Sequence, residues 1–324
     1  MSNILIVLSQ FRSTLVWVYH PTCKCIFIFL AIFFVLFQPL AFANTPPDPA
    51  YDAFDRGLYL KALKEAKKAS QRGEAQANTL VGRIYQEGLG VAQDLPEAIK
   101  WYQKGAGQGD TDSQFALGML LLKGDGIPRD AKLAADFFEE AARKGHVEAQ
   151  YNIALIYTQG LGRKENLEKA VNYMKQAAEK NNAKAQYDLG TFYSTGLGVK
   201  KNFEKAVFWT AKAAQLGLHE AQLEYAIMLF KGRGVQKDVV QAVRFFRMAA
   251  YKNNPIAQNR LARLYLYGVG IEPNMIEAAK WHLLARKRGV SDGKLDKLLF
   301  RLTQEERELA EKAANSFVEQ SDVQ

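Results

Sequence analysis

The sequence predicts an all-α fold, a solenoid in which six pairs of helices follow one another along the chain. Three observations lead to this prediction. The same residue types recur every 36 positions over six consecutive stretches, with no insertion between them. Apolar residues within each stretch follow helical spacing, as in Val81, Ile84 and Tyr85. A glycine pair interrupts that spacing once per stretch, where a helix must end for the chain to turn back.

The glycine pair ends the first helix of each predicted helix pair. Glycine adopts positive φ without a steric penalty, so it can end a helix and let the chain turn sharply. The first helix is expected to begin near Ala77 or its equivalents and to end at these glycines. The first column holds Gly88, Gly124, Gly160, Gly196, Gly232 and Gly268, and the second, two places later, holds Gly90, Gly126, Gly162, Gly198, Gly234 and Gly270.

Short polar residues mark the start of each second helix, because their side-chain oxygens accept hydrogen bonds from the free N–H groups of a first turn. They are Asp94, Asp130, Asn166, Asn202, Asp238 and Asn274. Glu97, Gln241 and Glu277 lie three residues after a cap and predict capping boxes in three repeats. The second helix should end at residues that tolerate a left-handed backbone, which are Gly109, Gly145, Asn181, Gly217, Asn253 and Gly289.

Three further columns predict how the helices pack. A small column allows close approach of the paired helix and holds Gly82, Gly118, Ala154, Gly190, Ala226 and Ala262. An alanine column in the second helix holds Ala98, Ala134, Ala170, Ala206, Ala242 and Ala278. An aromatic column follows three residues later with Trp101, Phe137, Tyr173, Trp209, Phe245 and Trp281. A single pair cannot bury these faces but stacked neighbours can, so we expect the aromatic column to be core.

The chain divides into a leader, an array and two caps. Arrays of this kind need polar-faced terminal elements. We expect a signal peptide at 1–43, a linker at 44–50, a degenerate N-terminal capping repeat at 51–76, repeats at 77–112, 113–148, 149–184, 185–220, 221–256 and 257–292, and C-terminal capping helices with a polar tail at 293–324. The last helix should open at Thr303 to Glu306 and carry Leu309, Ala310, Ala313 and Phe317.

The first 43 residues predict export. They contain Arg12 and Lys24 but no acidic residue, then an apolar run of 13 residues from Cys25 to Phe37, then small residues up to Ala43. This is the pattern of a Sec signal peptide cleaved after Ala43, which gives a periplasmic or secreted protein. The alternative is a retained membrane anchor, although a span needs about 20 apolar residues. Both cysteines lie in this segment, and its removal takes two of 43 basic residues and leaves a net charge of +7.

These columns resemble the Sel-one-like repeat (SLR) family, a relative of the tetratricopeptide repeat. The segment from Val81 to Val91 (VGRIYQEGLGV) is similar to the family pattern, and so is the segment from Leu189 to Val199. The resemblance runs from Ala77 to about Gly289. It implies a right-handed α/α superhelical solenoid that binds another protein or peptide, without naming that partner.

The resemblance also implies where a partner binds, because the first helices of related solenoids line the concave surface. Mapped onto this chain, the binding stripe holds Phe115, Met119, Leu122, Tyr151, Leu155, Tyr187, Leu223, Ile227, Phe230 and Leu266. An apolar trough of this kind takes a peptide or helix through aromatic anchors. The alternative is that several of these side chains pack between neighbouring repeats.

No motif predicts catalytic, cofactor-binding or metal-binding residues. The Gly-x-Gly pairs lack the third glycine of a dinucleotide loop and follow helices, so the turn interpretation is preferred. His146, His219 and His282 lie in separate repeats and are expected at the surface or in the groove. The basic residues alternate with acidic ones in every repeat, so nucleic acid is not an expected partner, and a membrane is one only if the leader is retained.

The sequence therefore favours a non-catalytic adaptor or scaffold in the bacterial periplasm or envelope, with a regulatory role as one variant. The alternative is a β-lactam-binding or β-lactam-hydrolysing enzyme, since secreted cysteine-rich members of the resembled family have been associated with that activity. Those members carry a disulfide in each repeat. The present chain contains no cysteine after residue 43, which disfavours the alternative.

Overall fold

A computed structural model describes residues 48–321, and those residues form sixteen helices and no strand. The predicted leader, both cysteines and residues 44–47 of the predicted linker lie outside the described residues. The all-α prediction is confirmed. No helix within the described residues combines the length and the apolar character that crossing a membrane requires.

Six helix pairs repeat with nearly identical bounds. The first helices are α4 (Ala75–Glu87), α6 (Thr111–Lys123), α8 (Val147–Gln159), α10 (Ala183–Thr195), α12 (His219–Lys231) and α14 (Pro255–Tyr267). The second helices are α5 (Leu95–Gly107), α7 (Ala131–Arg143), α9 (Leu167–Glu179), α11 (Phe203–Gln215), α13 (Val239–Tyr251) and α15 (Met275–Lys287). Each first helix begins two residues before the position predicted. In four repeats a side chain caps it, namely Asp110, His146, Asn182 and Asn254.

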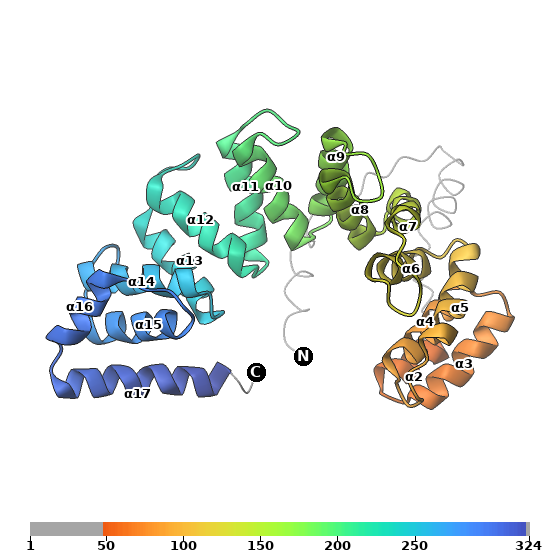
Figure 1. Ribbon diagram of the computed structural model, residues 1–324, viewed down its shortest axis with the longest axis horizontal. Helices are drawn as coiled ribbons and strands as arrows, with labels where there is room; N and C mark the ends of the chain where they lie inside the picture. Colours follow the sequence, from red (N-terminus) through yellow and green to blue (C-terminus); the bar gives the residue numbers. More distant parts are fainter. Residues whose placement is uncertain (1–47, 322–324) are drawn as a thin grey trace, which may run out of the picture. The chain divides into compact units, whose positions relative to one another are not determined.

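The pairs stack in chain order, as Figure 1 shows for α4 to α15. Each second helix packs against its own first helix and against the first helix of the next pair. The array from α2 to α17 is therefore held together by contacts between neighbours in sequence, as the solenoid prediction requires.

The glycine columns have the conformation predicted for them. All twelve glycines have φ between 64° and 87°. The second glycine of each pair has an additional role, because its loop lies against the first residue of the preceding second helix. A Cβ at Gly234 would lie 2.5 Å from the backbone oxygen of Phe203, and one at Gly198 would lie 2.9 Å from that of Leu167. The glycine pair thus ends a helix and also joins successive repeats.

The caps of the second helices are confirmed, whereas the capping boxes are wrong. All six predicted caps accept a hydrogen bond of 2.8–2.9 Å from the backbone N–H three residues on. The box fails because the cap's own N–H is already used. Asp94 N–H donates to the oxygen of Tyr85 across 2.9 Å. Glu97 and Glu277 instead accept from the indole N–H of Trp101 and Trp281, and Gln241 accepts from Tyr225.

The predicted ends of the second helices are confirmed by backbone geometry. Asn181 and Asn253 have φ of 64° and 62°, and they are the only residues other than glycine with positive φ among those described. The four glycines in the same column have φ between 85° and 96°. Each of these residues follows the helix end by two positions and turns the chain into the next first helix.

The aromatic column is only partly core, which corrects the prediction. Trp209 and Trp281 are buried, but Trp101, Phe137, Tyr173 and Phe245 are half-buried. The fully buried column is the next residue along, which is Tyr102, Phe138, Met174, Thr210, Phe246 and His282. Tyr102, Phe138 and Thr210 face the glycines of the small column. A Cβ at Gly82 would lie 2.6 Å from the ring of Tyr102, so the glycine makes room for it.

Shorter elements close the array. At the N-terminal end, α2 (Pro49–Asp55) and α3 (Tyr59–Gln71) form the capping pair, so Pro49 and Ala50 of the predicted linker are helical. At the C-terminal end, α16 (Gly293–Arg301) and α17 (Gln304–Ser321) pack on α15. Helix α17 begins one residue after Thr303, as predicted, and buries Ala310 and Ala314. Leu309 is exposed and Ala313 is half-buried, so the buried face is rotated slightly from the one predicted.

Candidate functional site

The ten side chains of the predicted binding stripe are all half-buried. Six of them line hollows in the surface. Phe115, Met119 and Tyr151 line one hollow, Ile227 and Phe230 line a second, and Leu266 lines a third. Leu122, Leu155, Tyr187 and Leu223 pack at the edges of the core clusters. The structure thus brings part of the stripe together in two places, and partner binding by these residues stays a prediction.

The Phe115 hollow, as we call the first, has a volume of about 610 Å³ and spans three repeats. Phe115 and Met119 come from α6, and Tyr151 comes from α8. Lys184 and neighbouring residues come from α10, and Leu216 and Leu218 come from the connection between α11 and α12. Side chains more than 100 positions apart in sequence therefore line one concave surface. The 36-residue repeat places equivalent residues of successive first helices side by side, which produces this arrangement.

Ring stacking and hydrogen bonds at His146 border the Phe115 hollow. The ring of His146 stacks on that of Phe115 at a centroid distance of 4.7 Å. His146 also caps α8 by accepting from the N–H of Ala149 across 3.1 Å, and its other nitrogen lies 3.1 Å from Asp112. The hydrogen bond with His146 lowers the pKa of the Asp112 carboxyl. Two adjacent first helices are thus linked at the edge of the hollow.

Tyr151 connects α8 to α10. Its hydroxyl donates to Asp188 Oδ2 across 3.0 Å. Burial raises the pKa of Asp188, and the hydrogen bond from Tyr151 opposes that rise. Burial, together with the charge of Asp188, raises the pKa of the Tyr151 hydroxyl. The phenol is therefore un-ionised and directed, which fixes the ring as part of the hollow's wall.

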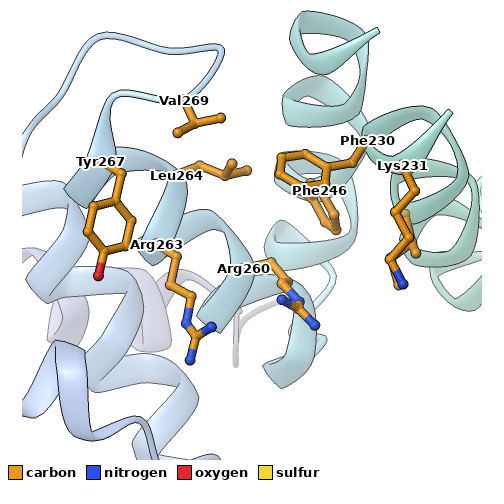
Figure 2. A pocket seen from close by; sticks show the side chains of 9 residues that line it. Phe230, Lys231, Phe246, Arg260, Arg263, Leu264, Tyr267 and Val269 are labelled. Carbon is orange, nitrogen blue, oxygen red and sulfur yellow. The ribbon is translucent and has the colours of Figure 1, made fainter. Parts of the chain in front are cut away.

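The second hollow, which we call the Phe230 hollow, lies between the fifth and sixth repeats and has a volume of about 260 Å³. Figure 2 shows Phe230 and Phe246 pointing toward Leu264 and Val269. Ile227 and Tyr267 complete its apolar wall. The remaining lining residues are cationic, and they are Lys231, Arg260 and Arg263. Their charged ends lie to one side of the apolar group in the same view.

Arg263 is held at the rim of this hollow by Asp292. Its Nε donates to Asp292 Oδ2 across 2.5 Å, and Asn259 donates to the same oxygen across 3.0 Å. Burial of Asp292 opposes its ionisation. The hydrogen bonds from Arg263, Asn259 and the backbone of Lys294 outweigh that effect and lower the pKa of Asp292 to about 2. Arg263 therefore keeps an ionised partner, whereas Lys231 and Arg260 extend as exposed cations.

The histidines do not all lie where the sequence predicted. His219 is half-buried at the surface and His146 borders the Phe115 hollow, as expected. His282 is fully buried, and its Nε2 lies 2.9 Å from Asp296 on α16. It belongs to the buried column, which lies one residue after the aromatic column that was predicted to be core. Within residues 48–321, no group of three or more His, Cys, Asp or Glu side chains is arranged to hold a metal ion.

Sequence reasoning missed a buried polar column on the first helices. In five repeats a glutamine Nε2 donates to a backbone oxygen in the last turn of the preceding second helix, across 3.0–3.5 Å. The column holds Gln114, Gln150, Gln186, Gln222 and Gln258. These glutamines recur every 36 residues, and that recurrence is the sequence signal that could have identified the column. The donors satisfy helix-end carbonyls and bind each repeat to the one before it.

Comparison with known families supports this architecture. The Sel1 repeat family matches residues 75–110, 111–146, 147–182, 183–218, 219–254 and 255–290, which together cover about two thirds of the chain. The chain belongs to the Sel1 repeat family. The matched stretches begin where α4, α6, α8, α10, α12 and α14 begin, so each Sel1 repeat is one helix pair with its connections. Sel1 repeats are generally protein-interaction scaffolds without catalytic activity.

Two solved Sel1 structures are similar to this chain. A Sel1 repeat protein from Oxalobacter formigenes is 30% identical with a TM-score of 0.66, covering 74% of this chain and 98% of that one. A protective antigen of uropathogenic Escherichia coli with an SLR fold is 26% identical with a TM-score of 0.71, covering 80% of this chain. The present chain spans only 56% of the antigen's length. Comparison with curated proteins gave no match.

Proposed function

We propose that this Sel1 repeat protein is a non-catalytic scaffold that binds another protein through its first helices, in the bacterial periplasm or envelope. One observation carries the proposal. Phe115, Met119 and Tyr151, from the first helices of two successive repeats, stay half-buried in a hollow that a third repeat and the connection after its second helix help to enclose. Aromatic and methionine side chains are enriched where proteins bind one another, because they bury much area while losing little conformational freedom.

The setting of the hollow favours a protein or peptide over a small molecule. Small-molecule sites bury most of their ligand within walls. The Phe115 hollow is instead open to solvent, and its lining is spread over three repeats. Polar side chains at its margin, including Glu148, Asn152 and Lys184, resemble the polar rim that surrounds an apolar interface core. A partner helix or extended segment fits such a surface.

The leader supports an exported location. Residues 1–43 carry the basic, apolar and small-residue regions of a signal peptide in the correct order. The absence of cysteine from the rest of the chain also suits an oxidising compartment, since no thiol can form an unwanted disulfide there. A regulator that holds a partner in an inactive state and a scaffold that assembles several partners are two variants of this function.

The decisive test is site-specific photo-crosslinking in the native envelope. A photoreactive phenylalanine analogue at Phe115 or Tyr151 should capture the same small set of proteins, identified by mass spectrometry. The matched control carries the analogue at Phe300, an aromatic residue on α16 that is 84% exposed and outside the stripe. Capture of the same proteins from Phe300, or none from Phe115 and Tyr151, would contradict the proposal.

A triple variant separates binding from packing. Replacement of Phe115, Tyr151 and Tyr187 by serine should abolish capture from a crosslinker at Met119 and leave helicity near that of the unmodified protein. Lost helicity in the circular dichroism spectrum would show instead that these side chains are core.

A further inference from the structure

We propose that the Phe230 hollow binds an acidic segment of the partner protein, in which one bulky apolar side chain is flanked by side-chain carboxylates. The inference rests on the proposed function, because it assigns a partner chemistry to a second part of the same helix face. It is carried by the combination of an apolar cavity with a rim of three cations and no acidic side chain, whereas the hollow lined by Leu266 sets its three cations beside Glu306.

The apolar part of the hollow fits one side chain. Its volume is about 260 Å³, and its wall is made by Ile227, Phe230, Phe246, Leu264 and Val269. Phe230 and Phe246 meet edge to face at a centroid distance of 6.5 Å, which fixes both rings. A preformed apolar cavity of this size favours one aromatic or large aliphatic anchor.

The rim sets the charge of what surrounds that anchor. Three cations line the hollow and no acidic side chain does. Asp292 balances only one of them, because it is bonded to Arg263. Lys231 and Arg260 come from different helices, α12 and α14, and their charged ends lie on the same side of the apolar wall (Figure 2). Two positive charges therefore remain for carboxylates on either side of an anchor.

The same positions in other repeats show that this rim is specific to the junction between the fifth and sixth repeats. The residues equivalent to Arg260 in the two preceding repeats are Asp188 and Glu224, and the residue equivalent to Lys231 in the first repeat is Glu87. The helix fold thus accepts either sign of charge at these positions. The cations at the Phe230 hollow are consequently not required by the repeat itself.

The probe is a fluorescein-labelled peptide in which one phenylalanine lies between two glutamates, with glycine and serine on both sides. Binding to the full mature chain is followed by fluorescence anisotropy. Changing both glutamates to glutamine should weaken binding by about tenfold, and changing the phenylalanine to alanine should weaken it by at least as much. Binding of the glutamate peptide should also fall as salt is raised.

Three variants have precedents within this chain and should fold normally. Arg260→Glu and Lys231→Glu introduce residues that the equivalent positions already carry, and each should weaken the glutamate peptide by about five- to tenfold. Val269→Asp removes part of the apolar wall, and Asp125 occupies the equivalent position in the second repeat. The matched control is Arg129→Glu, a charge reversal outside the hollow. The equivalent position in the next repeat already carries a glutamate, Glu165, and the control should leave binding unchanged.

Equal binding of the glutamate and glutamine peptides, or unchanged binding by Arg260→Glu, would overturn the inference. So would displacement of the peptide by an oligonucleotide of equal charge at the same concentration, because the hollow would then recognise charge alone. If no peptide binds but crosslinking from Tyr151 still captures a partner, this inference fails and the proposed function stands. If the peptide binds and that crosslinking fails, the reverse holds.

Discussion

The hydroxyl of Tyr151 donates to the carboxylate of Asp188 across 3.0 Å and ties the first helix of one Sel1 repeat to the first helix of the next. The bond lies beside the Phe115 hollow, so it orients a side chain that is proposed to contact the partner. The Asp188 carboxylate is half-buried, and its pKa is raised above the ordinary value of 3.8, chiefly by burial. Because this pKa is raised, the ionised Asp188 side chain destabilises the folded protein at neutral pH.

Asp188→Asn should stabilise the protein at neutral pH. A carboxyl whose folded-state pKa is raised contributes stability below the unfolded pKa, and this contribution is lost as pH rises through the folded pKa. Asparagine cannot ionise, and its oxygen still accepts from Tyr151. The variant should therefore melt at a higher temperature than the unmodified protein at pH 7, and this advantage should shrink toward pH 3. A constant difference between pH 3 and pH 7 would show that ionisation of Asp188 has no part in it.

Asp292→Asn should have the opposite effect. The pKa of Asp292 is lowered to about 2 from the ordinary value of 3.8. Its stabilising contribution is therefore present above pH 4 and is lost as the pH falls toward 2. The substitution should cost about 1–2 kcal/mol at pH 7. This is less than the full pKa shift implies, because Arg263 is partly exposed and solvent screens its ion pair with Asp292. Urea denaturation at pH 7 and pH 2 measures this, and the cost should largely disappear at the lower pH.

A control for that experiment is Asp238→Asn. Asp238 also caps a helix, and asparagine caps the equivalent helix in three other repeats. Its replacement should change stability by less than about 0.5 kcal/mol at either pH. An equal loss in both variants would mean that capping, and not the ion pair with Arg263, explains the effect at Asp292.

Phe138→Ala should destabilise the protein far more than Phe137→Ala. Phe138 is fully buried against the small column, where a Cβ at Gly118 would lie 2.7 Å from its ring, whereas Phe137 is half-buried. Truncation of a fully buried phenylalanine costs about 3–5 kcal/mol, and the loss at the half-buried position should be about half as large. Urea denaturation of the two variants makes the comparison. Equal losses would restore the aromatic column as core.

This contrast between neighbours shows where sequence reasoning was sufficient and where it was not. Features dictated by backbone geometry were predictable, because only glycine or asparagine suits the turns and only Asp or Asn fills the caps of the second helices. The burial of Tyr102 and its equivalents was not, since that column includes Met174, Thr210 and His282 and lacks a common residue type. The small column opposite it was noticed, but its contact with this column requires knowing how far each helix is rotated.

The binding surface was predictable only in part for a related reason. The half-buried stripe follows from helical spacing, so its residues could be chosen from the sequence. Which of them share a hollow depends on the angle between successive repeats, which no single repeat encodes. Lys231, Arg260 and Arg263 were missed because cations are spread over every repeat, and only their common position beside Phe230 sets them apart.

Gly234→Ala should destabilise the protein more than Gly217→Ala, although both glycines have positive φ. Gly234 has φ of 74° and Gly217 has φ of 89°, so alanine is strained at both positions by about 1–2 kcal/mol. At Gly217 a Cβ would meet nothing within 4 Å, whereas at Gly234 it would lie 2.5 Å from the oxygen of Phe203.

Gly234→Ala must therefore push the loop away from α11 in addition to adopting a strained backbone, so its cost should exceed that of Gly217→Ala by at least about 1 kcal/mol. Thermal unfolding followed by circular dichroism compares the two variants. Because the contact joins one repeat to the next, Gly234→Ala should also broaden the unfolding transition as the cooperativity between neighbouring repeats falls. Equal midpoints and equal widths would show that the second glycine only turns the chain and does not hold successive repeats together.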